Sequence, residues 1–222
     1  MKQDKSHQDK TKKNRTLVMF SGGLDSTAAL WHVLNRPEEY GDIHVHHIHI
    51  QNIENRWQAE AESVNTIYAY MRQNAPAKFT TSESVIRTPQ FGNQFMFDAE
   101  IFNYLSGYMT SRDPLINKVI LGVTGTDYEI GFDAVAKRGK AMHNAFHFDE
   151  EDNATRVKEF PLKNMTKDEV YKSLPPELAQ LTWSCRTPKY VDGKPIECGR
   201  CKTCVTEMAG VERPKPDKAG FK

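Results

Sequence analysis

Six consecutive residues near the N-terminus, Ser21-Gly22-Gly23-Leu24-Asp25-Ser26, have the donors and the spacing to hold a phosphate. They follow a short apolar run, Leu17–Phe20, and precede a helix-like stretch that starts at Thr27. Two adjacent glycines allow backbone angles and close approaches that a Cβ forbids. The N–H groups of such a turn, and of the helix after it, point at an anion that the helix dipole also favours. The segment therefore predicts a pyrophosphate cradle, to which Ser21, Ser26 and Thr27 add hydroxyl donors.

A simpler interpretation of the same residues is an ordinary glycine turn between a strand and a helix, with Ser26 or Thr27 as the N-cap. The position directly between an apolar run and a helical pattern favours the phosphate site. The loop lacks the Gly-Lys-Ser/Thr ending of a Walker loop, so the sequence does not indicate a lysine anchored on a γ-phosphate.

All four cysteines fall in one stretch of twenty residues, at Cys185, Cys198, Cys201 and Cys204. Gaps of two residues let successive thiolates converge on one ion, and four thiolates complete a tetrahedral structural zinc site. An iron–sulfur cluster and a pair of disulfides are the alternatives. We expect Zn²⁺, in a site that uses every thiol of the chain and leaves none for sulfur chemistry.

The composition of the 222-residue chain does not indicate nucleic-acid binding. Its 30 lysine and arginine residues balance 29 aspartate and glutamate residues, so a net charge of +1 gives no overall field for nucleic acid. No apolar run is as long as a membrane span or resembles the core of a signal peptide, so we expect a cytoplasmic protein. We expect a disordered basic tail over residues 1–15, a main domain over 16–180, a four-cysteine element over 181–210 and a flexible tail over 211–222.

Apolar patterns along the chain alternate between strands and helices. Strands are predicted at Leu17–Phe20, Ile43–Ile50 and Val119–Val123, and helices at Trp57–Arg72, Phe97–Met109 and from Thr166 to Leu174. This order favours an α/β fold with a doubly wound parallel sheet, in which ligands bind beyond the carboxyl ends of the strands. Three segments leave strands at that edge: Ser21–Ser26, Gln51–Glu60 and Thr124–Asp133.

The second predicted strand carries four histidines, which alternation divides between its two faces. His44 and His46 share one face, and His47 and His49 share the other. No carboxylate or cysteine lies within the run, so ordinary strand histidines are favoured over a metal site.

Two charged residues outside the loop are candidates for the same site. Thr166 and Glu169 form a capping box, which puts Lys167 at the first helical position, where a cation opposes the helix dipole. A contact with phosphate or adenylate explains that placement, and a solvated lysine is the alternative. Asp127 follows a buried strand directly and suits magnesium or a substrate amide, whereas an Asx turn is the plainer role.

The loop resembles the PP-loop of the ATP pyrophosphatase superfamily, whose members cleave ATP between its α- and β-phosphates. Together with the four-cysteine knuckle, it resembles the QueC, or 7-cyano-7-deazaguanine synthase, family over about residues 16–210. Further matching elements are Arg56 with Glu60 and Ala61, Val119–Val123 with Thr126-Asp127-Tyr128, Phe160-Pro161-Leu162 with Lys167, and Trp183-Ser184-Cys185.

This resemblance implies a Rossmann-like, adenine nucleotide alpha hydrolase-like fold that uses ATP and Mg²⁺ and forms a homodimer. It implies an ATP-binding loop made of Phe20, Ser21, Gly22, Gly23, Leu24, Asp25, Ser26, Thr27, Ala28, Ala29 and Leu30. It implies catalytic roles for Asp25, Ser26, Asp127 and Lys167, and substrate contacts for Arg56, Thr126, Asp127 and Asp133.

The reaction that the resemblance implies is an ATP-dependent C–N ligation. The family adenylates 7-carboxy-7-deazaguanine and adds ammonia to form an amide, and a second adenylation then dehydrates the amide to a nitrile. The chain lacks an arginine that the family has at Phe91-Gly92-Asn93-Gln94, and a cysteine and an arginine that it has within Ile130–Val135. An enzyme with another acceptor or an amide product, a PP-loop tRNA-modifying enzyme and a non-catalytic zinc protein therefore stay open.

Overall fold

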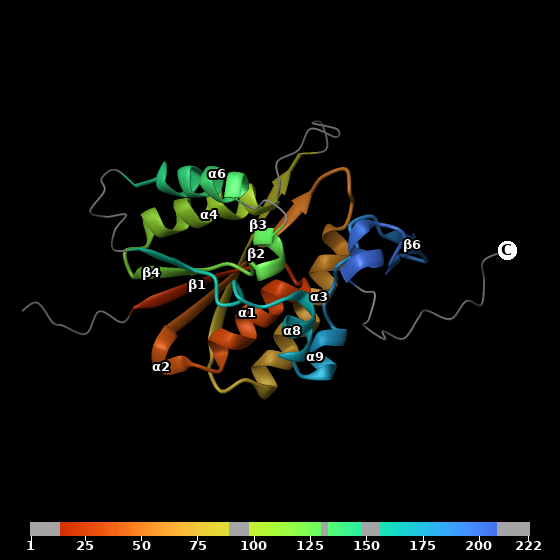
Figure 1. Cartoon of the computed structure of the whole chain (residues 1–222), viewed down its shortest axis with the longest axis horizontal. Helices are drawn as coiled ribbons and strands as arrows, with labels where there is room; N and C mark the ends of the chain where they lie inside the picture. Colours follow the sequence, from red (N-terminus) through yellow and green to blue (C-terminus); the bar gives the residue numbers. More distant parts are fainter. Residues whose placement is uncertain (1–13, 89–97, 130–132, 148–155, 208–222) are drawn as a thin grey trace, which may run out of the picture.

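A five-stranded parallel sheet forms the centre of the protein in the computed structural model, which describes residues 14–88, 98–129, 133–147 and 156–207 (Figure 1). Its strands lie in the order β3-β2-β1-β4-β5. They are β1 (Arg15–Phe20), β2 (Asp42–Gln51), β3 (Phe79–Arg87), β4 (Ile116–Ile120) and β5 (Val157–Glu159). Every pair of neighbours is parallel, because each connection between them crosses over through a helix or a long segment.

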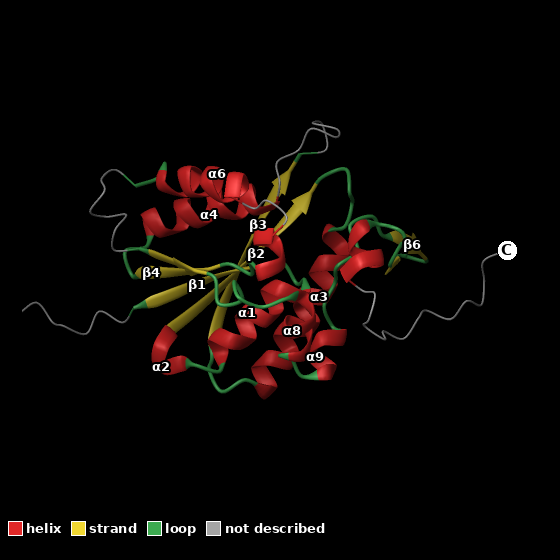
Figure 2. Cartoon of the chain, in the orientation of Figure 1, coloured by secondary structure: helices red, strands yellow, loops and turns green. Residues whose placement is uncertain are grey.

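Helices cover both faces of the sheet, as Figure 2 shows. On one face lie α1 (Leu24–Leu34), α3 (Trp57–Asn74), α8 (Lys167–Lys172) and α9 (Pro176–Gln180); on the other lie α4 (Asp98–Arg112) and α6 (Asp133–Asn144). Two short helices, α2 (Pro37–Tyr40) and α5 (Gly125–Glu129), lie in connections. The predicted doubly wound α/β fold is confirmed.

The alternation of side chains along the central strand builds two cores. Val18 and Phe20 pack with α1, α3, α8 and α9, whereas Leu17 and Met19 pack beneath α4. All four side chains are at most 3% exposed. Burial on both faces explains why this strand is a continuous apolar run, as is typical of a central parallel strand.

Several boundaries differ from the sequence prediction. Helix α1 begins at Leu24 with Gly23 as its N-cap, so Ser26 and Thr27 lie inside its first turn rather than at its cap. Strand β4 ends at Ile120, so the predicted strand was placed three residues too late. Segments β3 and β5 were not predicted as strands, because β3 is a polar edge strand and β5 has three residues.

The C-terminal segment is a small separate layer beside α3. Strands β6 (Lys189–Val191) and β7 (Lys194–Ile196) form an antiparallel hairpin, and a π-helical turn, η2 (Thr203–Glu207), follows. The Tyr190 hydroxyl donates a hydrogen bond to the Asn55 carbonyl at 2.8 Å. The predicted main domain starts at residue 16, whereas β1 already starts at Arg15; residues 1–13 and 208–222 of the predicted tails lie outside the described residues.

The helices of the described ranges include none that is long and apolar enough to cross a membrane. The strand order does, however, locate a ligand site. The order in which the chain adds strands reverses direction between β1 and β4, and the crevice beyond the carboxyl ends of two such strands is the usual binding place in an open α/β sheet.

Candidate functional site

The predicted phosphate loop leaves β1 at that crevice and turns sharply into α1. Gly22 has a φ of 79°, and a Cβ added there would lie 2.9 Å from Val64 Cγ2. Ser21 N–H donates to Ser26 Oγ at 3.2 Å, and Ser26 Oγ–H donates to the Gly23 carbonyl at 3.1 Å. The serine hydroxyls therefore fix the loop internally, and the first-turn N–H groups of α1 are left as the anion donors.

Gly122, which sequence reasoning did not single out, brings the end of β4 against this loop. A Cβ on Gly122 would lie 2.7 Å from both the Asp25 carbonyl carbon and the Ser26 nitrogen. Only a residue without a side chain lets the two backbones approach this closely. The signal was present in the sequence as a glycine within an apolar run, which is typical of a close backbone approach.

Lys167 joins two of the predicted carboxylates. Its Nζ forms an ion pair with Asp25 Oδ2 and lies 3.9 Å from Asp127 Oδ1. The other Asp127 oxygen, Oδ2, accepts hydrogen bonds from the N–H and the hydroxyl of Thr124, each at 2.8 Å. One oxygen of Asp127 therefore caps the start of α5 and the other faces the lysine, and the predicted contact with magnesium or a substrate amide stays a prediction.

The capping box that places Lys167 is confirmed. Thr166 N–H donates to Glu169 Oε2 at 2.7 Å, and Glu169 N–H donates to Thr166 Oγ1 at 3.3 Å. Lys167 therefore starts α8, and its ammonium lies 142 residues away in sequence from the carboxylate that it meets.

The other predicted substrate residues are less closely gathered. Thr126 is half-buried within α5, outside the residues that line the main cavity. Asp133 is the first residue of α6, and its side chain lies outside the described part of the structure. The same holds for the departures at Phe91–Gln94 and at 130–132, which fall in undescribed segments.

A cavity of about 960 Å³ extends from the phosphate loop along the crevice. One part of its wall is the loop with Asp25, Asp127 and Lys167. Apolar side chains of Met19, Leu121 and Phe102 line the space beneath α4. This volume lies near the upper end of the about 300–1,000 Å³ that small-molecule pockets commonly measure.

Arg56 lies in the same wall, within a cluster of mixed charge. It forms ion pairs with Glu54 and Glu60, each at 2.8 Å, and with Asp98. Its side chain is only 10% exposed. Arg186 shares two of these partners, Glu54 at 2.8 Å and Asp98 at 3.5 Å. We call these five residues the charge cluster.

Glu60 gives this cluster a pH dependence. Burial of its side chain, reinforced by the Asp98 and Glu54 charges and opposed by Arg56, raises its pKa from 4.5 to about 7. Between these two pKa values, Glu60 keeps its proton in the folded protein, whereas the same residue has lost it in the unfolded chain. The protonated Glu60 therefore contributes fully to the free energy of unfolding below about pH 4.5, and this contribution is lost as the pH rises to about 7.

The free energy of unfolding of the wild type should fall between about pH 4.5 and 7, and we expect that of the Glu60→Gln variant not to show this fall. In the wild type the Glu60 proton contributes up to about 3 kcal/mol over this interval, because each tenfold change in proton affinity corresponds to about 1.4 kcal/mol. Urea denaturation of both proteins at pH 5, 6 and 7 measures the difference between their slopes. Parallel curves would show that Glu60 ionises at its ordinary pKa.

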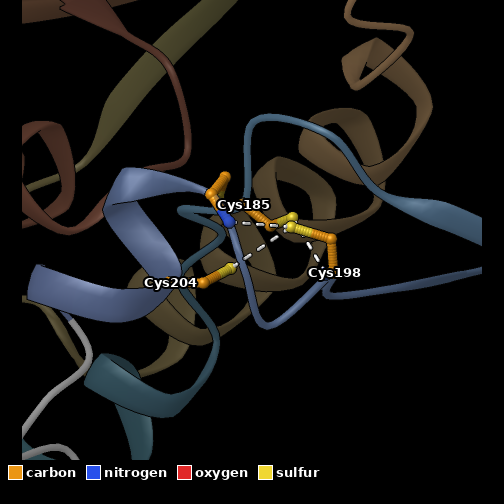
Figure 3. A group of neighbouring side chains, drawn as sticks. Cys185, Cys198 and Cys204 are labelled. Carbon is orange, nitrogen blue, oxygen red and sulfur yellow. Dashed lines mark hydrogen bonds between the residues drawn. The ribbon is translucent and has the colours of Figure 1, made fainter.

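The four cysteines converge in space as their spacing predicts. Their sulfur atoms all lie within 4.8 Å of one another, and Figure 3 shows Cys185, Cys198 and Cys204 turned toward a common point. Backbone N–H groups of Cys201 and Arg200 donate to Cys198 Sγ at 3.3 and 3.5 Å. These bonds and the Thr187 hydroxyl outweigh the effect of burial and lower the pKa of Cys198 to about 6. Four thiols in this arrangement fit a tetrahedral metal ion.

Hydrogen bonds tie the cysteine segment to the phosphate loop. Trp183 N–H donates to the Gly22 carbonyl at 2.9 Å. Ser63 Oγ–H lies within bonding distance of the Gly22 carbonyl at 3.2 Å and of the Leu181 carbonyl at 2.6 Å. The segment that leads to the four cysteines thus also supports the turn that is predicted to bind phosphate.

The histidines of β2 divide between its faces as predicted and serve strand contacts. Ser82 Oγ lies 2.7 Å from both His44 Nε2 and His46 Nδ1, while His47 Nδ1–H donates to the Phe20 carbonyl at 2.9 Å. Burial lowers the pKa of His47 to about 4. In the described ranges, the cysteines are the group whose geometry could hold a metal ion.

Comparison with known proteins points to one family. The model of the queuosine biosynthesis protein QueC matches residues 99–214, just over half of the chain. A 7-cyano-7-deazaguanine synthase from Pyrococcus abyssi (strain GE5 / Orsay) is 24% identical over 229 residues, which cover 89% of this chain and 92% of that protein. Among solved structures, the U34-tRNA thiolase NcsA from Methanococcus maripaludis with its 4Fe-4S cluster has a TM-score of 0.49 and 12% identity. That match covers 90% of this chain, which spans 65% of the thiolase chain.

Proposed function

Because the chain belongs to the QueC family of queuosine biosynthesis proteins, we propose that it converts 7-carboxy-7-deazaguanine and ammonia into 7-cyano-7-deazaguanine at the expense of ATP. The observation that carries the proposal is the loop at the crevice between β1 and β4, with Lys167, Asp25 and Asp127 beside it. These residues supply what α,β-cleavage of ATP requires: anion donors, a cation and carboxylates for a magnesium ion.

In the first step, a carboxylate oxygen of the acid attacks the α-phosphorus and the bond to the bridging oxygen breaks. The N–H groups of the first turn of α1 bind the departing pyrophosphate, and the Lys167 ammonium offsets its negative charge. Magnesium, when bound, neutralises further phosphate charge, and Asp25 and Asp127 offer the hard oxygen ligands that it prefers.

Ammonia then attacks the acyl carbon, AMP leaves, and an amide forms. A second adenylation, now on the amide oxygen, is followed by loss of AMP and two protons to give the nitrile. Water competes with ammonia for the activated acid, and the apolar side chains beneath α4 are the part of the wall that would disfavour it.

Mass spectrometry tests this proposal directly. Purified protein is incubated with the acid, ATP, magnesium and ammonium, and with the same mixture lacking ammonium. We expect nitrile and repeated turnover to AMP and pyrophosphate in the first mixture only, because without ammonium the reaction stops at the adenylated acid after one pyrophosphate per active site. Product that stops at the amide, or that forms only with another amine, would favour the diverged enzyme, and absence of AMP and pyrophosphate in all mixtures would contradict ATP-dependent ligation.

The cysteine cluster bears on the alternative of a sulfur-transferring tRNA enzyme. All four cysteines of the chain meet in one site, so no further thiol is left to carry sulfur. We propose Zn²⁺ as the resident ion, because four protein thiolates close a structural site. Metal analysis distinguishes zinc from an iron–sulfur cluster, which absorbs visible light.

We also propose that the protein is a cytoplasmic homodimer. Light scattering measures the number of its subunits.

Removal of the metal is expected to weaken nucleotide binding as well as stability. The bond from Trp183 N–H to the Gly22 carbonyl and the bond from Ser63 to the Leu181 carbonyl both involve the segment that precedes Cys185. We expect a chelator to lower the affinity for ATP about 10-fold, equivalent to one or two lost hydrogen bonds of about 1 kcal/mol. Calorimetric titration with a non-hydrolysable ATP analogue, before and after zinc is restored, measures this. Unchanged affinity in the metal-free protein would show that the two sites are independent.

A further inference from the structure

Asp98 is a carboxylate that the family resemblance did not single out, at the start of α4 in the wall of the cavity. Its Oδ2 accepts from Arg56 Nη2, and Arg186 Nη1 lies 3.5 Å from the same oxygen. Its Oδ1 is buried and has no hydrogen-bond partner among the residues that the structure describes. A buried carboxylate oxygen without a donor is costly, so this atom points to a ligand that supplies one.

The two arginines hold Asp98 in place, and each of them also forms ion pairs with glutamates. Arg186 binds Glu54 through two parallel bonds, Nε to Oε1 at 2.9 Å and Nη2 to Oε2 at 3.0 Å. Arg56 is held by Glu54 and Glu60, each at 2.8 Å. Two flanking guanidinium groups offset the cost of burying the Asp98 charge, and their planar geometry fixes its orientation.

Asp98 lies in the wall of the same cavity as the phosphate loop, and a short piece of chain links the loop to Arg186. Arg186 comes three residues after Trp183, whose N–H binds the Gly22 carbonyl. Three residues hold the Cα atoms of Trp183 and Arg186 within about 11 Å of each other, a span similar to that of a bicyclic ring with one substituent. A molecule whose acid group is activated at the loop can therefore present its opposite edge to the charge cluster.

On a 7-substituted deazaguanine, the edge opposite the acid carries N1–H and the 2-amino group. Both are donors, and a carboxylate is the group that accepts from two adjacent donors at once. Because the arginines already bind Oδ2, an analogue without the 2-amino group removes a donor from Oδ1, which a buried site penalises.

We propose that Asp98 is the specificity-determining residue of the proposed reaction, accepting hydrogen bonds from N1–H and the 2-amino group of a guanine-type ring. Arg56 and Arg186 are positioning residues that hold the Asp98 carboxylate. This inference rests on the proposed function, because it takes the substrate ring from there.

The test compares two substrates, 7-carboxy-7-deazaguanine and the same acid without its 2-amino group. Steady-state pyrophosphate release gives kcat and KM for each acid and KM for ATP. We expect the wild type to prefer the guanine-type acid by about 10- to 100-fold in kcat/KM, the discrimination usual for one paired hydrogen-bonded contact to a base. Asp98→Asn is expected to reduce the preference to about 3-fold or less through the KM of the acid, with the KM for ATP unchanged.

Glu100→Gln is the matched control, because Glu100 lies on the same helix, pairs with Arg138 at 2.8 Å and does not line the cavity. It should keep the wild-type preference. Arg186→Lys keeps the positive charge but loses the two parallel bonds to Glu54, so it should raise the KM of the guanine-type acid several-fold. This variant provides the test if Asp98→Asn does not fold.

Different results would contradict the proposed function and the role of Asp98. A wild type that releases pyrophosphate with neither acid overturns the proposed function. A wild type that uses both acids equally, or an Asp98→Asn enzyme that keeps the full preference, overturns the assignment of Asp98 and leaves the proposed function standing.

Discussion

Asp25→Asn is expected to lower the rate of pyrophosphate release by about 100- to 1,000-fold, the usual effect of removing one electrostatic group aimed at developing charge. Asp25 lies in the first turn of α1 and pairs with Lys167, which also faces Asp127 at 3.9 Å. Asparagine keeps the shape of the side chain but neither its charge nor its strength as a magnesium ligand. Rapid-quench measurement of AMP formation under saturating ATP separates this effect from weaker binding.

A neighbouring aspartate provides the control for that variant. Asp168 follows Lys167 and pairs with Lys172 on the surface, where its side chain is 69% exposed. Asp168→Asn should leave both rate and stability unchanged within error, since exposed ion pairs of this kind contribute little. An Asp25→Asn enzyme that forms AMP at the wild-type rate would remove Asp25 from the reaction.

Local sequence was sufficient to predict the parts of the site that local chemistry builds. The glycine pair and the serines of the phosphate loop lie within six residues, and the loop has the sharp turn that they require. The capping box around Lys167 spans four residues and is present in full. The cysteine spacing likewise brings four sulfur atoms together. In each case, the residues that specify the geometry lie within twenty residues of one another in the chain.

Contacts between distant segments could not be predicted in this way. Arg186 meets Glu54 across 132 residues, and Asp98 meets Arg56 across 42. Arg56 itself was predicted to contact substrate, but its surroundings of three carboxylates depend on the meeting of α3, α4 and the cysteine segment. The edge strands β3 and β5 were missed for a related reason, since pairing with a neighbour rather than an apolar pattern specifies them.

Gly122→Ala is the substitution with the largest expected effect on the fold of the site. The added Cβ would lie 2.7 Å from the Asp25 carbonyl carbon and the Ser26 nitrogen, which are backbone atoms that cannot rotate away. Overpacking of this kind costs about 1–3 kcal/mol, equivalent to a decrease in Tm of about 3–10 °C for a chain of this size. Because the clash is with the first turn of α1, affinity for ATP should fall at least about 10-fold as well.

Gly23→Ala in the same loop separates steric conflict from the mere loss of a glycine. Gly23 has φ −78° and ψ 167°, angles that any residue adopts, and an added Cβ would meet only ordinary contacts, with Ser21 Oγ at 3.4 Å and the Trp183 carbonyl oxygen at 3.5 Å. Its Tm should therefore stay within about 2 °C of the wild type. Equal Tm values for the two variants would mean that the end of β4 does not press on α1, and the crevice would then have to be wider than the backbone contact at Gly122 implies.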